Sequence, residues 1–361
     1  MSAQRILIFN WRDFRHVEAG GSERYVQEIA KHFVELGSIV TVLVGNDGTL
    51  PKKEYIDGVE ILRRGTKYTI FMWAAFQYIF GKKHYDLVIE SQNGIPFFIP
   101  LYVRTRRACI IHHVHTPFFK KYLPLPFSHI GILIESIVAP LVYKKTAMFT
   151  VSPSTKKELE KAYGEQKITI AHAGVDTSIY EPGEKNKDPL IVFIGRLVRY
   201  KSLHIAIKAM LHVAETIPNV QFAIAGQGPD AGRLKSLVNR FELNSYVFFT
   251  GYVTEQEKVK LLQRAWVFVQ PSSLEGWSIS VLEANACGTP VIGANISGLQ
   301  DSIQDGYNGY RVQYGNAGAL AEKIIDLIKN PSVLKNMSRN AYANSHQFNW
   351  KRTAQRLFYH V

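Results

Sequence analysis

The chain has 361 residues, two cysteines and a hydrophobic content of 46%, values typical of a globular protein with room for two domains. Two distant cysteines exclude a disulfide framework, and no apolar run is long enough to span a membrane, so we expect a reducing, cytoplasmic setting. The net charge is +13, and basic residues exceed acidic ones by 8 within residues 1–175. This excess predicts an anionic partner, either nucleic acid, an anionic membrane or a phosphorylated metabolite.

The first half alternates short apolar runs with longer amphipathic segments, a pattern typical of a parallel sheet with helices on both faces. Strands are expected at 5–9, 39–44, 58–62, 87–90, 109–113 and 148–151. Helices are expected at 22–36, 71–80, 130–143 and 154–163.

The same alternation starts again after residues 180–189, a polar segment with the Pro and Gly content of a linker. Strands are expected at 190–194, 220–225, 246–250, 267–270 and 290–293, and helices at 202–215, 233–241, 255–264 and 278–286. The repetition predicts two doubly wound domains, with ligands bound at the carboxyl ends of the strands.

Two carboxylates, Glu275 and Glu283, stand eight positions apart across the expected start of a helix at Trp277. Eight helical residues rise about 12 Å, so the two acids can bind hydroxyl groups at opposite ends of a ligand. The helix N-terminus between them favours an anion. A nucleotide sugar has this layout of sugar, diphosphate and ribose, although such a pair of glutamates is also compatible with ordinary surface charges.

Residues 275–292 resemble the E-x7-E signature and its continuation in the retaining glycosyltransferases of family 4. Residues 195–202 resemble the family's G-R-L-x-x-x-K-G segment, and residues 226–229 resemble its G-x-G-P turn. The resemblance implies an α/β protein of GT-B architecture, with two doubly wound parallel-sheet (Rossmann-like) domains facing each other across a cleft. The acceptor-side domain is then expected at 1–178, joined by 345–361 crossing back, and the nucleotide-sugar domain at 179–344.

Arg196 and Lys201 follow the expected strand 190–194, where two cations would neutralise a diphosphate and the charge that develops on it during sugar transfer. The resemblance implies this role for both residues. It also implies that Glu275 contacts the sugar and that Glu283 contacts the ribose.

Three histidines, His112, His113 and His115, lie at the end of the expected strand 109–113 without the acids or cysteines of a zinc site. The family resemblance places a histidine beside the donor sugar, and His115 is the better match. The expected catalytic residues are therefore His115, Arg196, Lys201 and Glu275.

The Gly20-Gly21 pair after the first strand lets backbone N–H groups approach an anion closely, although it is also a common tight turn. The resemblance adds turns that line the nucleotide and a loop before Glu283, in which Ser278 replaces a common Gly. The donor-binding residues expected are Gly20, Gly21, Gly226, Gly228, Val253, Gly276, Trp277, Ser278 and Glu283.

No D-x-D pair occurs in the chain, so the usual ligands for a metal-held nucleotide sugar are missing. We expect no metal and no cofactor, with the nucleoside-diphosphate sugar as donor substrate. Two basic and aromatic segments, 67–83 and 118–124, fit the interface of an anionic membrane, although an apolar helix between strands, such as the first, is more often part of the core. Without a recognised binding module, nucleic acid is not an expected partner.

The expected function is a retaining, metal-independent glycosyltransferase that moves a sugar from a nucleoside-diphosphate sugar to a hydroxyl of a lipid-linked or polysaccharide acceptor. Its setting would be cytoplasmic, including the cytoplasmic face of a membrane. Three alternatives stay open: a nucleotide-sugar 2-epimerase of the same fold, a non-catalytic nucleotide-sugar or glycan-binding protein, and a nucleic-acid-binding protein.

Overall fold

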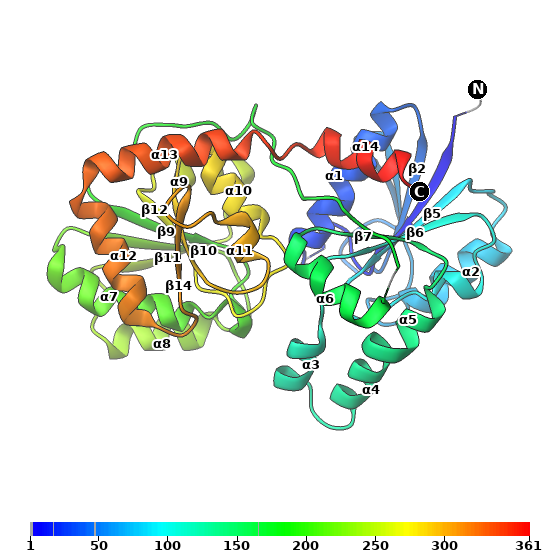
Figure 1. Ribbon diagram of the computed structural model, residues 1–361, viewed down its shortest axis with the longest axis horizontal. Coiled ribbons are helices and arrows are strands. Elements are labelled where there is room, and N and C mark those ends of the chain that lie inside the picture. The colour runs from blue at the N-terminus through cyan, green and yellow to red at the C-terminus, as the bar shows by residue number, and fades with distance from the viewer. Residues whose placement is uncertain (1–2, 17, 47, 165) are drawn as a thin grey trace. The chain divides into compact units, whose positions relative to one another are not determined.

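The computed structural model describes residues 3–16, 18–46, 48–164 and 166–361, which divide into two compact units (Figure 1). The N-terminal unit contains Met1–Ala173 and Trp350–Val361, and the C-terminal unit contains Gly174–Asn349. The sequence places these boundaries at 178 and 345, five residues away at each junction.

The N-terminal unit is built on an eight-stranded sheet of order β3-β4-β2-β1-β5-β6-β7-β8. Its strands are β1 (Arg5–Phe9), β2 (Ile39–Val44), β3 (Lys53–Ile56), β4 (Val59–Arg63), β5 (Leu87–Gln92), β6 (Arg106–Ile111), β7 (Ala147–Thr150) and β8 (Ile168–Ile170). The pairings are parallel except that β3 runs antiparallel to β4 at the edge. The central strands are almost wholly buried, as expected where helices cover both faces.

The helices of this unit include one from the far end of the chain. They are α1 (Gly21–Glu35), α2 (Ile70–Phe80), α3 (Thr116–Tyr122), α4 (Phe127–Leu133), α5 (Ala139–Val142), α6 (Pro153–Tyr163) and α14 (Trp350–Tyr359). The last of these, red in Figure 1, packs on α1: the ring centroids of Trp350 and Tyr25 lie 5.5 Å apart, and those of Phe358 and Phe33 lie 5.9 Å apart. The chain end thus completes the core of the N-terminal unit.

The C-terminal unit has a six-stranded sheet of order β11-β10-β9-β12-β13-β14, with parallel pairings throughout. Its strands are β9 (Leu190–Ile194), β10 (Gln221–Ala225), β11 (Val247–Gly251), β12 (Val267–Gln270), β13 (Val291–Ala294) and β14 (Gly309–Val312). Its helices are α7 (Leu203–Thr216), α8 (Ala231–Arg240), α9 (Glu255–Arg264), α10 (Ile279–Ala286), α11 (Leu299–Ser302), α12 (Ala317–Lys329) and α13 (Pro331–Ser345). Figure 1 shows α7, α8 and α12 on one face and α9, α10 and α13 on the other.

Two of the expected elements near the candidate site are wrong in detail. The strand expected at 109–113 ends at Ile111, so the histidines follow it. The helix expected at 130–143 is interrupted by a π-helical turn (Ile134–Val138) between α4 and α5. Both differences change where His115 and its neighbours lie.

Helix α2 is less buried than an apolar helix between strands normally is. Of its side chains only Ile70 and Ala74 are buried. Met72, Phe76 and Phe80 are 69%, 54% and 71% exposed. No helix among the described residues is long and apolar enough to cross a membrane.

Candidate active site

An ion pair joins two of the expected catalytic residues at the carboxyl edge of the C-terminal sheet. Lys201 follows β9 and Glu275 follows β12, which are hydrogen-bonded neighbours. The Nζ of Lys201 lies 2.5 Å from Oε1 of Glu275, and both side chains are largely buried. The fold therefore brings a cation and a carboxylate from distant parts of the sequence to one place.

Two further side chains fix Glu275. Gln270 donates from Nε2 to Oε1 at 3.1 Å, and Ser272 donates from Oγ to the same oxygen at 2.9 Å. Gln270 also donates to Oγ of Ser278 at 2.8 Å. These contacts hold the segment between β12 and α10 in a single arrangement.

The helix does not begin at Trp277 as the sequence suggested. It begins at Ile279, because Ser278 has φ 72° and ψ 92°, outside the helical region. This conformation is costly for a residue with a side chain and explains why a glycine suits this position. Between Glu275 and Glu283, only the residues from Ile279 onward are helical. The rise of about 12 Å expected for eight helical residues therefore does not describe the distance between the two glutamates.

Arg196 lies on the same edge as Lys201. Its Nη2 donates to the hydroxyl of Tyr200 at 2.8 Å. The backbone of Tyr200 also accepts a hydrogen bond from the N–H of Ser273 at 2.8 Å, which ties the loop after β9 to the loop after β12. Arg199, by contrast, is exposed.

Gly226 and Gly228 are required by the close approach of two loops. A Cβ atom on Gly226 would lie 1.9 Å from the carbonyl oxygen of Gly195, and one on Gly228 would lie 2.3 Å from that of Leu197. Gly226 also has φ 133°. These glycines let the turn after β10 pack directly under the loop that leads to Arg196.

The other expected donor-binding residues of this unit lie on the same edge. Gly276 touches the loop before α11, where a Cβ on Gly298 would lie 2.3 Å from the carbonyl oxygen of Glu275. Val253 is half-buried between β11 and α9. The Trp277 side chain is 4% exposed and packs on Phe348, with ring centroids 5.0 Å apart, so its indole serves packing and only its backbone is left for a ligand.

Glu283 is held by a second polar cluster. Its Oε1 accepts a hydrogen bond from the hydroxyl of Tyr180 at 3.0 Å and one from Nζ of Lys258 at 2.8 Å. Glu255 shares both partners, at 2.6 Å from the Tyr180 hydroxyl and 3.1 Å from Lys258. Burial, and then the carboxylates of Glu283 and Glu255, raise the pKa of Tyr180, so this hydroxyl stays a donor.

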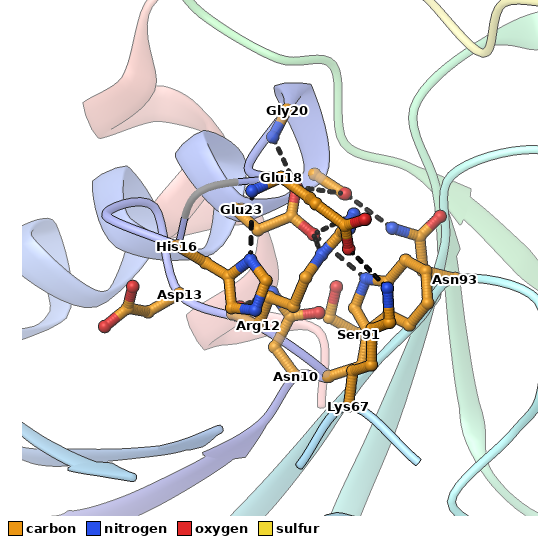
Figure 2. A network of polar contacts seen from close by, with 12 residues as sticks. Asn10, Arg12, Asp13, His16, Glu18, Gly20, Glu23, Lys67, Ser91 and Asn93 are labelled. Atoms are coloured by element: carbon orange, nitrogen blue, oxygen red, sulfur yellow. Dashed lines mark hydrogen bonds and ion pairs between the residues drawn. The ribbon is translucent and has the colours of Figure 1, made fainter. Parts of the chain in front are cut away.

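In the N-terminal unit Gly20 is the N-cap of α1 (Figure 2). The backbone N–H of Gly20 donates to Oε2 of Glu23 at 2.8 Å, and Oγ of Ser22 donates to the same oxygen at 3.0 Å. The Gly20 amide, expected to face an anion, is therefore committed to Glu23, while Gly21 begins the helix.

The three histidines after β6 have different surroundings. His112 contacts Oγ of Ser91 through Nε2 at 3.0 Å, and burial lowers its pKa to about 4, as expected of a neutral core residue. The ring of His113 contacts that of His115, with centroids 3.9 Å apart and the planes tilted by 31°. His115 precedes the first residue of α3 and lies near Gly94, whose Cβ would be 3.8 Å from its ring.

Glu135 holds the backbone and ring of His115. Its Oε1 accepts the N–H of His115 at 2.6 Å and lies 3.6 Å from Nδ1, and its Oε2 accepts Oγ1 of Thr116 at 2.7 Å. Burial acts to raise the pKa of Glu135, but its contacts with His115 and Thr116 prevail and hold it below the ordinary value. The residue lies in the π-helical turn.

Within the described ranges no group of three or more His, Cys, Asp or Glu side chains is arranged to hold a metal ion. Arg196, Lys201 and the N-terminus of α10, which has no side-chain cap, are sources of positive potential on the C-terminal unit.

Several residues of these clusters were not anticipated. Gln270 is the polar last residue of a buried strand, a signal that could have identified it. Glu135 is a lone acid in an apolar segment, which is equally recognisable. Tyr180 lies in the linker, and nothing in its sequence surroundings indicates a contact with Glu283.

Comparisons with known proteins identify the family and the fold. The family model for Glycosyltransferase Family 4 matches residues 19–179, and the model for Glycosyl transferases group 1 matches residues 175–344. An uncharacterized glycosyltransferase of Methanocaldococcus jannaschii is 25% identical over 97% of this chain and 96% of its own.

Two solved structures share the fold. Sucrose-phosphate synthase from Thermosynechococcus elongatus superposes with a TM-score of 0.85 at 18% identity, over 98% of this chain and 97% of that one. HepE of Anabaena, crystallised with UDP-glucose, has a TM-score of 0.78 at 19% identity, over 98% of each chain.

The two parallel-sheet α/β units and these similarities define a glycosyltransferase with the GT-B fold. Because the two family models together span residues 19–344, the chain belongs to the glycosyltransferases of family 4.

Proposed function

We propose that this enzyme transfers a sugar from a nucleoside-diphosphate sugar to a hydroxyl group of a lipid-linked or polysaccharide acceptor. The observation that carries the proposal is the Lys201–Glu275 pair beside Arg196 at the carboxyl edge of the C-terminal sheet. It supplies cations for a diphosphate and a carboxylate for sugar hydroxyls within one small area. HepE, a structural neighbour, was crystallised with UDP-glucose, which supports a nucleotide-sugar donor.

The donor diphosphate would bind to Arg196 and Lys201 and so replace Glu275 as the partner of Lys201. Lys201 pairs with Glu275, and a diphosphate placed at the N-terminus of α10 would compete for that ammonium group. Glu275 is then released to accept hydrogen bonds from the sugar, while Gln270 and Ser272 keep it in position. As the sugar leaves, the diphosphate gains charge, and fixed cations lower the barrier to this step.

Glu283 would bind the ribose at the other end of the donor. Tyr180 and Lys258 both donate to its Oε1, so the carboxylate is oriented before the nucleotide arrives. His115 would contact the transferred sugar, with Glu135 fixing its position.

We also propose that the anomeric configuration is retained and that no metal ion takes part. No sequence motif provides the paired carboxylates of a retaining glycosidase, so attack from the side of the leaving phosphate is the mechanism that the family resemblance favours. Arg196, Lys201 and the α10 N-terminus would replace a metal as the source of positive potential.

The exposed apolar residues of α2 support contact with a membrane. Met72, Phe76 and Phe80 are exposed on the unit that carries the larger basic excess, and Lys82 and Lys83 follow directly. An apolar face bordered by lysines suits an anionic bilayer surface, so we propose a lipid-linked acceptor used at the cytoplasmic face of a membrane.

The proposal is tested with a panel of nucleotide sugars. Binding of each is measured by thermal shift, and product formation is then measured in the presence of EDTA. A ligand at a hundred times its dissociation constant stabilises the folded state by about 2.7 kcal/mol. Consumption of one donor with release of nucleoside diphosphate supports transfer. Conversion of the donor into its 2-epimer, binding without any turnover, or activity that requires Mg²⁺ would each reject part of it.

A further inference from the structure

Two cations of the N-terminal unit, Arg12 and Lys67, have no part in the proposed donor site. Nη1 of Arg12 lies 3.2 Å, and Nζ of Lys67 lies 2.7 Å, from the same oxygen, Oε2 of Glu18 (Figure 2). Arg12 follows β1 and Lys67 follows β4, and both strands run parallel to β2. Two cations that meet at one carboxylate oxygen can also meet at one oxygen of a different anion.

The guanidinium of Arg12 has contacts that do not involve Glu18, and the backbone places Lys67 near it. The Arg12 side chain is 4% exposed, its Nη2 lies 3.3 Å from Oε1 of Glu23, and its guanidinium lies 4.0 Å from the ring centroid of Trp11. A Cβ on Gly45 would lie 2.8 Å from the Trp11 carbonyl oxygen and 3.0 Å from the backbone nitrogen of Lys67. The segments that carry Arg12 and Lys67 are therefore in close contact through Gly45.

Glu18 differs from its two partners because it is accessible. Its side chain is 45% exposed, whereas that of Glu23, which also binds Arg12, is 1% exposed. The hydrogen bond from Lys67 holds the pKa of Glu18 below its ordinary value, so the carboxylate is charged at neutral pH. Glu18 is therefore the exposed carboxylate of the cluster, and its Lys67 partner is itself 30% exposed.

We propose that Arg12 and Lys67 form a subsite for a phosphoryl group of the acceptor, and that Glu18 occupies this subsite until the acceptor binds. This inference rests on the proposed function and narrows its acceptor to a phosphorylated one. The donor diphosphate has its own cations, Arg196 and Lys201, in the C-terminal unit. A phosphoryl group offers more charge and more acceptor oxygens than a single carboxylate, so it displaces Glu18.

Trp11 provides a local signal, because its Nε1 donates to Glu23 at 2.9 Å and its ring stacks on Arg12. The protein is labelled with 5-fluorotryptophan, and the Trp11→Phe variant identifies one of the five tryptophan resonances in the ¹⁹F NMR spectrum. Inorganic phosphate is titrated first. Glucose 6-phosphate and short-chain phosphatidic acid then distinguish a phosphorylated sugar from a lipid phosphate, with glucose and short-chain diacylglycerol as uncharged controls.

Two isosteric variants should act in opposite directions. Glu18→Gln removes the internal competitor and should tighten phosphate binding at the Trp11 signal about tenfold, and Lys67→Gln should weaken it by a similar factor. Lys53→Gln is the matched control, because it removes another lysine–glutamate pair, with Glu60 at 2.8 Å, and should change nothing.

The measurement needs neither donor nor turnover, so its result is independent of whether sugar transfer is found. A phosphate response that tightens in Glu18→Gln and weakens in Lys67→Gln supports the subsite, and the tighter of the two organic phosphates identifies the acceptor class. No response of the Trp11 resonance to phosphate, or an equal response in both variants, overturns it.

Discussion

Glu135 is expected to affect sugar transfer indirectly, through the position of His115. Its two carboxylate oxygens accept hydrogen bonds from the N–H of His115 and the hydroxyl of Thr116. It thereby fixes both the start of α3 and the ring that precedes it. We therefore regard Glu135 as a positioning residue for His115.

Replacing Glu135 by Ala should lower kcat about a hundredfold, because a displacement of about 1 Å at a catalytic group costs that much. Glu135→Gln keeps an oxygen for the His115 N–H and should recover most of the rate, with the donor KM little changed in both variants. Steady-state kinetics at saturating donor measures this. Glu160→Ala is the control, since the Glu160 side chain is 45% exposed and its pair with Lys156 is 3.7 Å long. If Ala and Gln were equally active, Glu135 would have no positioning role.

Glu90 makes stability depend on pH. Its carboxyl group is buried, accepts the hydroxyl of Tyr143 at 2.6 Å and the N–H of Phe97 at 3.0 Å, and burial raises its pKa from 4.5 to about 7. As the pH rises between these two values, the unfolded chain loses this proton and the folded chain keeps it. The free energy of unfolding therefore falls, by about 3 kcal/mol at most at about 1.36 kcal/mol per pKa unit.

Glu90→Gln cannot ionise, so its unfolding free energy should fall less than that of the wild type between pH 5 and pH 8. Urea denaturation at both pH values measures the difference. Parallel pH profiles of the two proteins would show that Glu90 is not the group responsible.

The glycine turn after β10 is the element that most directly supports the donor site. Gly226→Ala places a methyl group 1.9 Å from the Gly195 carbonyl oxygen, so the two loops must separate. We expect a loss of about 3 kcal/mol of stability and weaker donor binding. Gly232→Ala is the matched control, because a Cβ there meets nothing within 4 Å and should stabilise α8 by up to about 1 kcal/mol. Urea denaturation measures the stability of both variants. If Gly226→Ala were as stable as Gly232→Ala, the loops at Gly195 and Gly226 would not be in such close contact.

Elements with a strong apolar pattern were predictable from the sequence. The strands β1, β2, β9 and β12 and the helix α9 have the expected bounds, because each is a continuous apolar run or an amphipathic helix with clear ends. The edge strands β3, β8 and β14 were missed. They are short and partly exposed, so their sequences lack a distinct pattern.

In the candidate site, too, some features could be predicted from the sequence and others could not. Glu275, Lys201 and Arg196 could be placed together because parallel strands end at one edge of a sheet. The positive φ of Ser278 and the π-helical turn around Glu135 depend on tertiary contacts, which no local pattern reports. The partners that orient Glu283 come from a linker and a neighbouring helix, so the carboxylate was predicted but its surroundings were not.

At the scale of the whole molecule, the net charge of +13 should make association with anionic vesicles dependent on salt. Each lysine near such a surface contributes about 1 kcal/mol, so replacing Lys82, Lys83, Lys120 and Lys121 by Glu should abolish co-sedimentation at low salt. The control replaces four exposed lysines of the C-terminal unit by Glu: Lys208, Lys235, Lys329 and Lys335. If both quadruple variants failed to co-sediment with the vesicles, the net charge of the protein, and not the surface formed by these four lysines, would be responsible for membrane binding. Failure of the wild type to bind would reject membrane contact.

In the proposed reaction Lys201 and Glu275 drive the departure of a nucleoside diphosphate from its sugar. The direct test is the rate of nucleoside-diphosphate release at saturating donor, in EDTA, for the wild type, Lys201→Gln and Glu275→Gln. We predict release by the wild type and a loss of about 10²–10³ in kcat for Lys201→Gln, the effect of removing one charge-stabilising group, with Glu275→Gln also impaired. Release by Lys201→Gln and Glu275→Gln at the wild-type rate would contradict the account.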